Sequence, residues 1–115
     1  MPRLRCSIHT RFILNQVAAA TGVSREELLS ASIARRLSRP RQLAMWLIRR
    51  NTGHTLQRIG RVFHRHPSTV HHALQLTEQR LQDDPATVRQ VITIEASLGR
   101  YATQPPLQET AHVHP

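Results

Sequence analysis

Residues 56–73 contain the feature that most restricts the fold of this chain. A short segment with apolar residues at helical spacing ends near Phe63, a polar turn follows, and a longer helical segment begins at Pro67. A short helix, a tight turn and a longer helix are the layout of a helix-turn-helix, whose second helix lies in the major groove of DNA. The start of the second helix carries Ser68, Thr69 and two histidines, whose side chains are small or polar enough to reach base edges or phosphates.

The composition favours helices for the rest of the fold. Only 3% of the 115 residues are aromatic, so the core has to be built from Leu, Ile, Val and Ala, which suits packed helices better than a sheet. We predict an all-α fold, a small bundle of about five to six helices that contains the helix-turn-helix. The predicted domain organisation is a flexible N-terminus at 1–7, a helix-turn-helix domain at 8–100 and a disordered tail at 101–115.

Apolar periodicity and capping residues predict the individual helices. The predicted ranges are 8–20, 40–51, 56–63, 67–82 and 85–99, with a short helix after the capping box Ser24–Glu27 and a loop at 30–39. The helix at 40–51 is the most continuously apolar and should be the central core helix. On the last two helices the predicted apolar positions are Val70, Ala73, Leu74, Thr77, Leu81, Val88, Val91, Ile92 and Leu98.

Positive charge is concentrated in the first 65 residues. They hold 13 arginines against Glu26 and Glu27, a balance of +11, whereas residues 66–115 hold 3 arginines against 5 acids, a balance of −2. A basic half on a small domain indicates a polyanionic partner, most often nucleic acid; the alternative is a basic protein without a specific ligand. All 16 basic residues are arginine, which suits bidentate contacts to phosphate and guanine.

Missing residue types argue against several classes of function. Because the chain has no lysine, it has no P-loop lysine and no Schiff-base lysine. The single cysteine, Cys6, excludes an internal disulfide and fits a reducing compartment. Six of the eight histidines lie in close pairs that lack zinc-site spacing, and the acids are few and scattered. We predict no enzyme activity, no metal and no cofactor, and a cytoplasmic, nucleoid-associated protein without a membrane span.

Three separated blocks of sequence resemble the C-terminal DNA-binding domain of the bacterial replication initiator DnaA. They are Arg39–Met45, Leu56–Phe63 and Ser68–Ala73, which keep the family's order with little change in spacing, and the resemblance extends over about residues 8–98. It implies a helical domain of the Trp-repressor/DnaA type that binds a short, non-palindromic duplex site. The ATPase and N-terminal domains of the initiator have no counterpart here, so we expect a stand-alone relative.

The resemblance and the charge pattern together predict three groups of site residues. Phosphate contacts are predicted for Arg41, Gln42, Arg58 and Arg61; base contacts for Arg65, His66, Ser68, Thr69 and His72; and a minor-groove loop at 31–39 with Arg35, Arg36 and Arg39. Plain helix capping by Ser68 and Thr69, and a solvated face for the arginines, are the alternatives. A cation such as Arg41 in a first helical turn opposes the helix dipole, which a bound phosphate would explain.

The chain departs from the family pattern at two places. His66-Pro67 stands where the family usually has Asp-His, so an acceptor for a cytosine amino group and an imidazole donor are both replaced. Residues 31–33 are Ala-Ser-Ile where the family has a Lys/Arg cluster. We predict sequence-specific binding of double-stranded DNA by an accessory or regulator of replication initiation or transcription, with a replication or transcription protein as a second partner. The alternatives are a helix-turn-helix regulator of another type and a protein-interaction module that has lost specific DNA binding.

Overall fold

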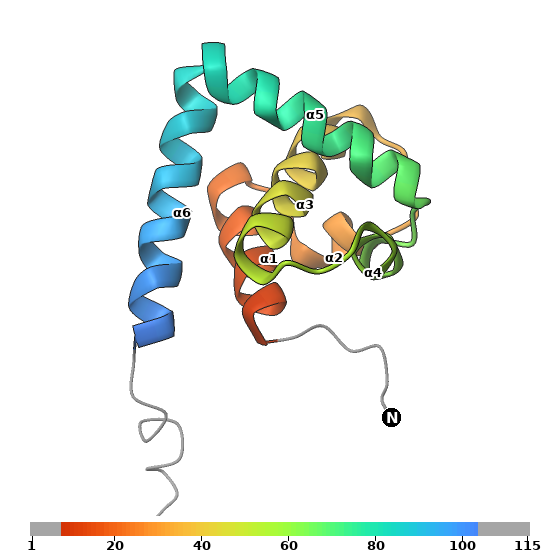
Figure 1. The fold of residues 1–115 in the computed structure, drawn as a ribbon. Helices are drawn as coiled ribbons and strands as arrows, with labels where there is room; N and C mark the ends of the chain where they lie inside the picture. The colour runs from red at the N-terminus through yellow and green to blue at the C-terminus, as the bar shows by residue number, and fades with distance from the viewer. Residues whose placement is uncertain (1–7, 104–115) are drawn as a thin grey trace, which may run out of the picture.

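A computed structural model describes residues 8–103 of the chain (Figure 1). In this range the chain forms six α-helices, one short 3-10 helix and no strand. The elements are α1 (Ile8–Thr21), α2 (Arg25–Leu29), the 3-10 helix η1 (Arg35–Leu37), α3 (Ser38–Thr52), α4 (Leu56–Phe63), α5 (Pro67–Asp83) and α6 (Pro85–Thr103). The predicted all-α fold with a helix-turn-helix at α4 and α5 is confirmed.

Helix α3 is the centre of the molecule. Figure 1 shows α1 and α5 on either side of it, with α6 forming the outer edge beyond α1. Every residue from Pro40 to Ile48 except Gln42 is buried, and Ala44, Leu47 and Ile48 have no exposed surface. The core is aliphatic apart from Phe63 and Trp46. The composition therefore predicted the fold class correctly, and the continuous apolar run at 40–51 predicted the central helix.

Capping side chains set the helix boundaries where the sequence places them. Ser24 and Glu27 form the reciprocal capping box of α2, and the Thr55 hydroxyl accepts the N–H of Arg58 at the start of α4. Gly53 ends α3 with φ at 71°, in the left-handed region that glycine adopts without strain. These local signals are short-range, which is why the sequence alone defines them well.

The predicted loop at 30–39 is more ordered than the sequence indicates. It contains η1, whose Leu37 is 1% exposed, and α3 begins at Ser38, two residues before Pro40. Burial of Leu37 in the core gives this segment a fixed position.

Helix α6 differs from the prediction in the exposure of Ile92 and in the position of its C-terminal end. Ile92 is 61% exposed rather than part of the core, because the buried stripe of α6 runs through Val91, Ile94 and Leu98. Helix α6 continues to Thr103, so residues 101–103 belong to it rather than to the predicted tail. The predicted flexible segment 1–7 and the rest of the tail lie outside the described residues.

Candidate nucleic-acid interface

The turn between α4 and α5 is built around Gly60. A Cβ atom at this position would lie 2.5 Å from the backbone oxygen of Arg65, so only glycine lets the end of the turn approach α4. The N–H of Arg65 donates to the carbonyl of Gly60 at 2.8 Å. His64 provides the reversal of the chain with a left-handed backbone, φ 59° and ψ 45°. This turn fixes how α5 is presented.

The first turn of α5 exposes the polar side chains predicted to read bases. His66 is the N-cap: its Nδ1 accepts the N–H of Ser68 at 3.0 Å and lies 2.8 Å from the Ser68 hydroxyl. Ser68, Thr69 and His72 are all exposed, whereas Val70 and Ala73 on the opposite side are buried. The imidazole thus performs the capping role that a carboxylate performs in other helices, and Pro67 occupies the first helical position, where no N–H is required.

Arg41 does not lie on the surface, contrary to the expectation for a phosphate contact. It is 6% exposed, and its guanidinium donates to the carbonyls of Glu27, Leu28, Ser30 and Ser32 at 2.6–3.0 Å. Burial, and then the charge of Arg65, lower the pKa of Arg41 below its ordinary value. Carbonyl dipoles therefore stabilise this cation in the first turn of α3, and no phosphate is needed to explain it.

Arg65 supports the same segment from the other side. Its guanidinium donates to the carbonyl of Phe63 at 2.9 Å and, at 3.3–3.4 Å, to the carbonyls of Ser32 and Ser30. Two arginines from different elements thus bind the same two carbonyl groups. The segment between α2 and η1 is held against α3 and the turn of the helix-turn-helix.

Gln42 is half-buried and oriented by Arg80. The guanidinium of Arg80 donates to Oε1 of Gln42 at 2.6 Å, which leaves the amide NH2 of Gln42 as a donor toward the other side. Burial, and then the charge of Arg39, lower the pKa of Arg80. Arg80, which the sequence did not single out, therefore positions a predicted site residue.

A cavity of about 190 Å³ brings the predicted groups together. It lies between the segment after α2, the start of α3 and the first half of α5, and it is lined by Ile33, Ser38, Arg41, Gln42, Met45, Arg65, Thr69, His72 and Ala73. Five of these residues were predicted as phosphate or base contacts, and they come from two separate stretches of sequence, 41–42 and 65–72. The fold thus gathers residues that are up to 40 positions apart on one surface depression.

A comparison with known protein families agrees with the helix-turn-helix geometry of α4 and α5. Residues 10–76 match the family described as "Bacterial dnaA protein helix-turn-helix". The chain belongs to this family. The match begins in α1 and ends within α5, so it includes every residue that lines the cavity.

Individual relatives agree with the family match. The chromosomal replication initiator protein DnaA of Desulfatibacillum aliphaticivorans is 37% identical over 82 residues, which are 71% of this chain and 18% of that protein. DnaA of Deinococcus radiodurans is 38% identical with the same coverage. DnaA of Caulobacter sp. (strain K31) is 36% identical over 102 residues, 84% of this chain and 21% of that protein. The chain thus spans about a fifth of the length of these DnaA relatives.

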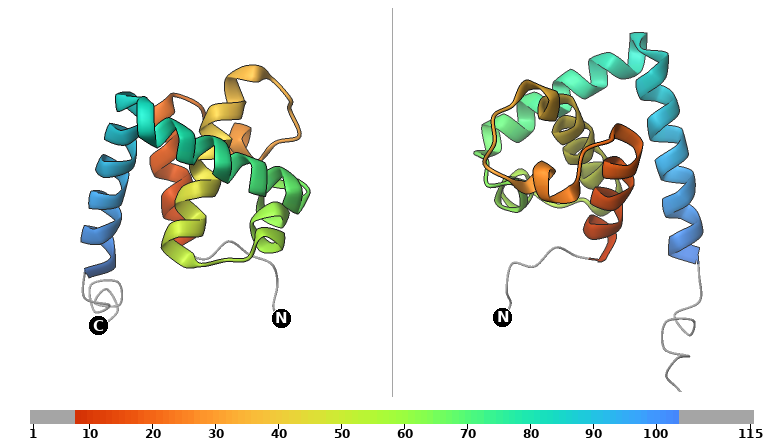
Figure 2. Two further views of the ribbon diagram at one scale, coloured as in Figure 1. Left: turned by 45° about the horizontal axis from the view of Figure 1, so that its top comes forward. Right: turned by 180° about the vertical axis from the view of Figure 1, so that it is seen from behind.

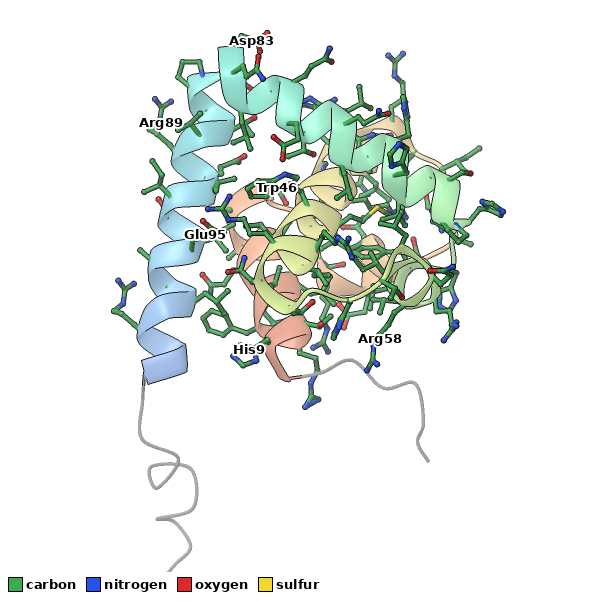
Figure 3. The ribbon with its side chains drawn as sticks, in the orientation of Figure 1. His9, Trp46, Arg58, Asp83, Arg89 and Glu95 are labelled. Atoms are coloured by element: carbon green, nitrogen blue, oxygen red, sulfur yellow. The ribbon has the colours of Figure 1, made fainter. Side chains whose placement is uncertain are left out.

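The arginines predicted on the loop and on α4 differ in their partners. Arg36 pairs with the carboxylate of Glu27, and Arg39 pairs with Asp84 at 2.9 Å. Arg35 is exposed, and so are Arg58 and Arg61 on α4; none of these three forms an ion pair with a described carboxylate. Figure 3 shows Glu95 and Arg89 on α6, and Arg58 on the side of the molecule away from this helix. Positive charge is therefore uncompensated on the DnaA-like α4 side.

The sequence did not assign a role to three residues that shape this DnaA-like surface, namely Gly60, Arg80 and Ile33. The signal for Gly60 was available, because a glycine inside a helical pattern weakens the helix and therefore indicates a packing reason at that position. Arg80 gave no local signal, since its role depends on Gln42 on another helix. No described helix is long and apolar enough to cross a membrane, and residues 9–100 contain no group of three metal-ligating side chains.

Proposed function

We propose that this DnaA-family chain binds double-stranded DNA in a sequence-specific manner and acts at the nucleoid as an accessory or regulator of replication initiation or transcription. It acts by binding, without a reaction of its own. Helix α5 enters the major groove, and the segment between α2 and α3 approaches the neighbouring minor groove. The relatives' name, chromosomal replication initiator protein, supports the connection with replication.

The observation that carries this proposal is the shared cavity beside the start of α5. It combines the exposed polar side chains Thr69 and His72 with the amide donor of Gln42 and the positive charge of Arg65. Side-chain donors beside the positive end of a helix dipole are a favourable environment for a phosphate group. A phosphate held there positions α5 against the base edges, which alone carry sequence information.

The proposed roles of the site residues follow from their placement. Arg58 and Arg61 contact phosphates, because they are exposed and lack carboxylate partners among the described residues, and the exposed Arg35 belongs to the minor-groove segment. Ser68, Thr69 and His72 contact bases, with His66 holding the first turn of α5. Arg41 and Arg65 act through the segment that they hold, and Gln42 acts through the amide that Arg80 orients.

Selection of bound sites from a random pool of duplexes tests the proposal. We expect the wild-type protein to enrich one non-palindromic sequence, and S68A/T69A to lose most of the preference for it over random DNA. R58A is the matched control: it should weaken binding to all duplexes about equally, because phosphates carry no direct sequence information. Failure of the wild-type protein to enrich any sequence would contradict specific binding.

We expect His66 and Pro67 to give this chain a different preferred DNA sequence from that of the replication initiator. His66 caps α5 through a ring nitrogen, so an Asp at the same position keeps the cap while restoring an acceptor. We expect wild-type protein to prefer its own selected site over the initiator's site, and H66D/P67H to shift this preference toward the initiator's site. Competition with the two duplexes measures the shift; equal preference in both proteins would exclude a role for these residues in specificity.

A further inference from the structure

The corner between α5 and α6 contains a second cavity, with a volume of about 310 Å³. Figure 2 shows this corner, where the two helices meet at a sharp angle. Side chains from the end of α1, the start of α3, the end of α5 and the start of α6 line the cavity. It shares no lining residue with the cavity beside the start of α5. The proposed contacts to DNA therefore leave this second cavity without a role.

The hydroxyl of Thr77 is a polar group in this cavity that the folded chain leaves without a partner. Thr77 lines the cavity and is 1% exposed, and its Oγ1 has no hydrogen-bond partner among the described residues. A buried hydroxyl without a partner destabilises a fold, and a valine would fill almost the same space without this cost. A ligand that bonds to the hydroxyl explains why a threonine stands here.

Arg80 adds charged donors to the same cavity. It follows Thr77 by three positions on α5, which puts both side chains on one face of the helix. Nη1 of Arg80 donates to Oε1 of Gln42 at 2.6 Å, whereas Nε and Nη2 have no hydrogen-bond partner among the described residues. Nε and Nη2 form one edge of the guanidinium, and such an edge binds a carboxylate through two parallel hydrogen bonds. The bond to Gln42 fixes the orientation of this edge, which lowers the ordering cost of binding.

The charges around the cavity favour a ligand with a single negative charge. Burial, and then the charge of Arg39, lower the pKa of Arg80, and the carboxylate of Asp84 opposes this effect. Oδ1 of Asp84 accepts the N–H of Ala86 at 3.2 Å. Its Oδ2 accepts from the hydroxyl of Thr87 at 2.8 Å and from Arg39 at 2.9 Å. The carboxylate of Asp84 is therefore already bonded and would repel a doubly charged anion, whereas Arg80 has no carboxylate partner within ion-pair distance among the described residues.

We propose that this cavity binds a small aliphatic monocarboxylate, whose carboxylate accepts hydrogen bonds from Arg80 and from the hydroxyl of Thr77. Ala20, Pro40 and Leu43, which belong to the apolar part of the lining, pack against its carbon chain. The inference goes beyond the proposed function, because this ligand binds whether or not DNA is present. Since Arg80 also orients Gln42, one hydrogen bond connects the ligand site with the cavity beside the start of α5.

Titration of the full chain with hexanoate, followed by calorimetry, tests the proposal. We expect saturable binding with a Kd on the order of 1 mM, as for a ligand of this size. Hexanol, which lacks the charge, should bind at least about 10-fold more weakly. Binding of hexanoate should weaken about 10-fold in T77V and at least about 30-fold in R80Q. R61A on α4 is the matched control and should bind hexanoate as wild type does. Without ligand, T77V should unfold at the same temperature as wild type or above it, because it removes an unpartnered hydroxyl.

Four outcomes would overturn the proposal. Absence of saturable hexanoate binding at about ten times the expected Kd would show that the cavity takes no carboxylate. Equal affinities for hexanoate and hexanol would show an apolar cavity without an anion site. Equal affinities of T77V, R80Q and R61A for hexanoate would place the binding elsewhere on the arginine-rich surface. Tighter binding of inorganic phosphate than of hexanoate would assign the site to a phosphate group instead. All four are measured without DNA, so they are independent of whether the proposed function holds.

Discussion

The α4–α5 side and the α6 side of this molecule differ in their carboxylates: α4 carries Arg58 and Arg61 and no acid, whereas α6 and its capping residue carry Glu95 and Asp84 beside Arg89 and Arg100. On the α6 side, carboxylates pair with arginines: Asp84 with Arg39, and Glu95 with Arg50 at 3.2 Å. On the α4 side, Arg58 and Arg61 are exposed and have no carboxylate partner among the described residues. Clustering of unpaired arginines on one surface is not needed for solubility and adds repulsion between like charges. The difference indicates which side meets a polyanion.

The two sides also differ in how their backbones are fixed. Around the turn between α4 and α5, the chain depends on a glycine that admits a carbonyl at short range and on guanidinium groups that bind carbonyls. Helix α6 is a regular helix with an apolar stripe, and nothing lies near the absent side chain of Gly99. The candidate interface therefore has the more demanding geometry, and substitutions there should cost more.

The same substitution at two glycines should give the largest contrast between the sides. In G60A the new methyl meets the Arg65 carbonyl, and we expect a loss of about 3 kcal/mol or more in the free energy of unfolding. G99A, in the open helix α6, should gain about 0.5–1 kcal/mol by restricting the unfolded chain. Urea unfolding followed by circular dichroism measures both. A G60A protein as stable as wild type would contradict the close approach.

Substitution of two arginines of α3 should reduce the stability of the protein by different amounts, because one is buried and the other is exposed. R41A removes a buried guanidinium that satisfies four carbonyl groups, so we expect a loss of about 3 kcal/mol. R50A removes a group whose side chain is 59% exposed, paired with Glu95 and 5.3 Å from the Trp46 ring, so the loss should stay within about 1 kcal/mol. Equal losses would mean that the carbonyl contacts of Arg41 contribute little.

The two sides should also differ, by a smaller amount, in how their stability depends on pH. Burial, and then the charge of Arg58, lower the pKa of His54, whose Nε2 is buried without a hydrogen-bond partner among the described residues. The stability that neutral His54 contributes is therefore present above the unfolded pKa of about 6.5 and is lost as pH falls through and below it. H54Q should remove this loss between pH 7 and pH 5.

The pH response of Asp84 on the other side begins at lower pH. The hydrogen bond from Thr87, with smaller contributions from Ala86 and Arg39, lowers the pKa of the Asp84 carboxyl. Its contribution is present above the unfolded pKa of about 3.9 and decreases as pH falls below that value. D84N should therefore leave the change between pH 7 and pH 5 as in wild type. Thermal unfolding over a pH series distinguishes the two variants; a wild-type response in H54Q would contradict the first assignment.

How far the sequence predicts this structure depends on the range of the interactions involved. Helix ends defined by Thr55, Gly53 and the Ser24–Glu27 box were predicted, because each signal acts within four residues. The helix-turn-helix followed from periodicity in the same way. Ile92 was misplaced because a pattern of apolar residues alone does not tell which of two adjacent faces packs on α1.

The roles of the arginines were less accessible from the sequence. Arg41 and Arg58 both occur in basic stretches, yet one is buried under carbonyl groups and the other is exposed. The difference arises from where the segment after α2 runs, and that path is fixed by the buried Leu37 and by contacts between residues 9–35 positions apart. Local sequence carries no information on such contacts, so the interface was predicted as a region rather than residue by residue.

The salt dependence of DNA binding tests the charge asymmetry most directly. Each phosphate contact contributes a slope of about −0.9 in log K against log salt, so roughly 4–7 contacts predict a wild-type slope near −4 to −6. R58A/R61A should flatten it by about 2, whereas R89A/R100A, an equal change in charge on α6, should leave it as in wild type. A wild-type slope near zero, or equal flattening by the two double variants, would contradict the assignment of the α4 side as the DNA-binding surface.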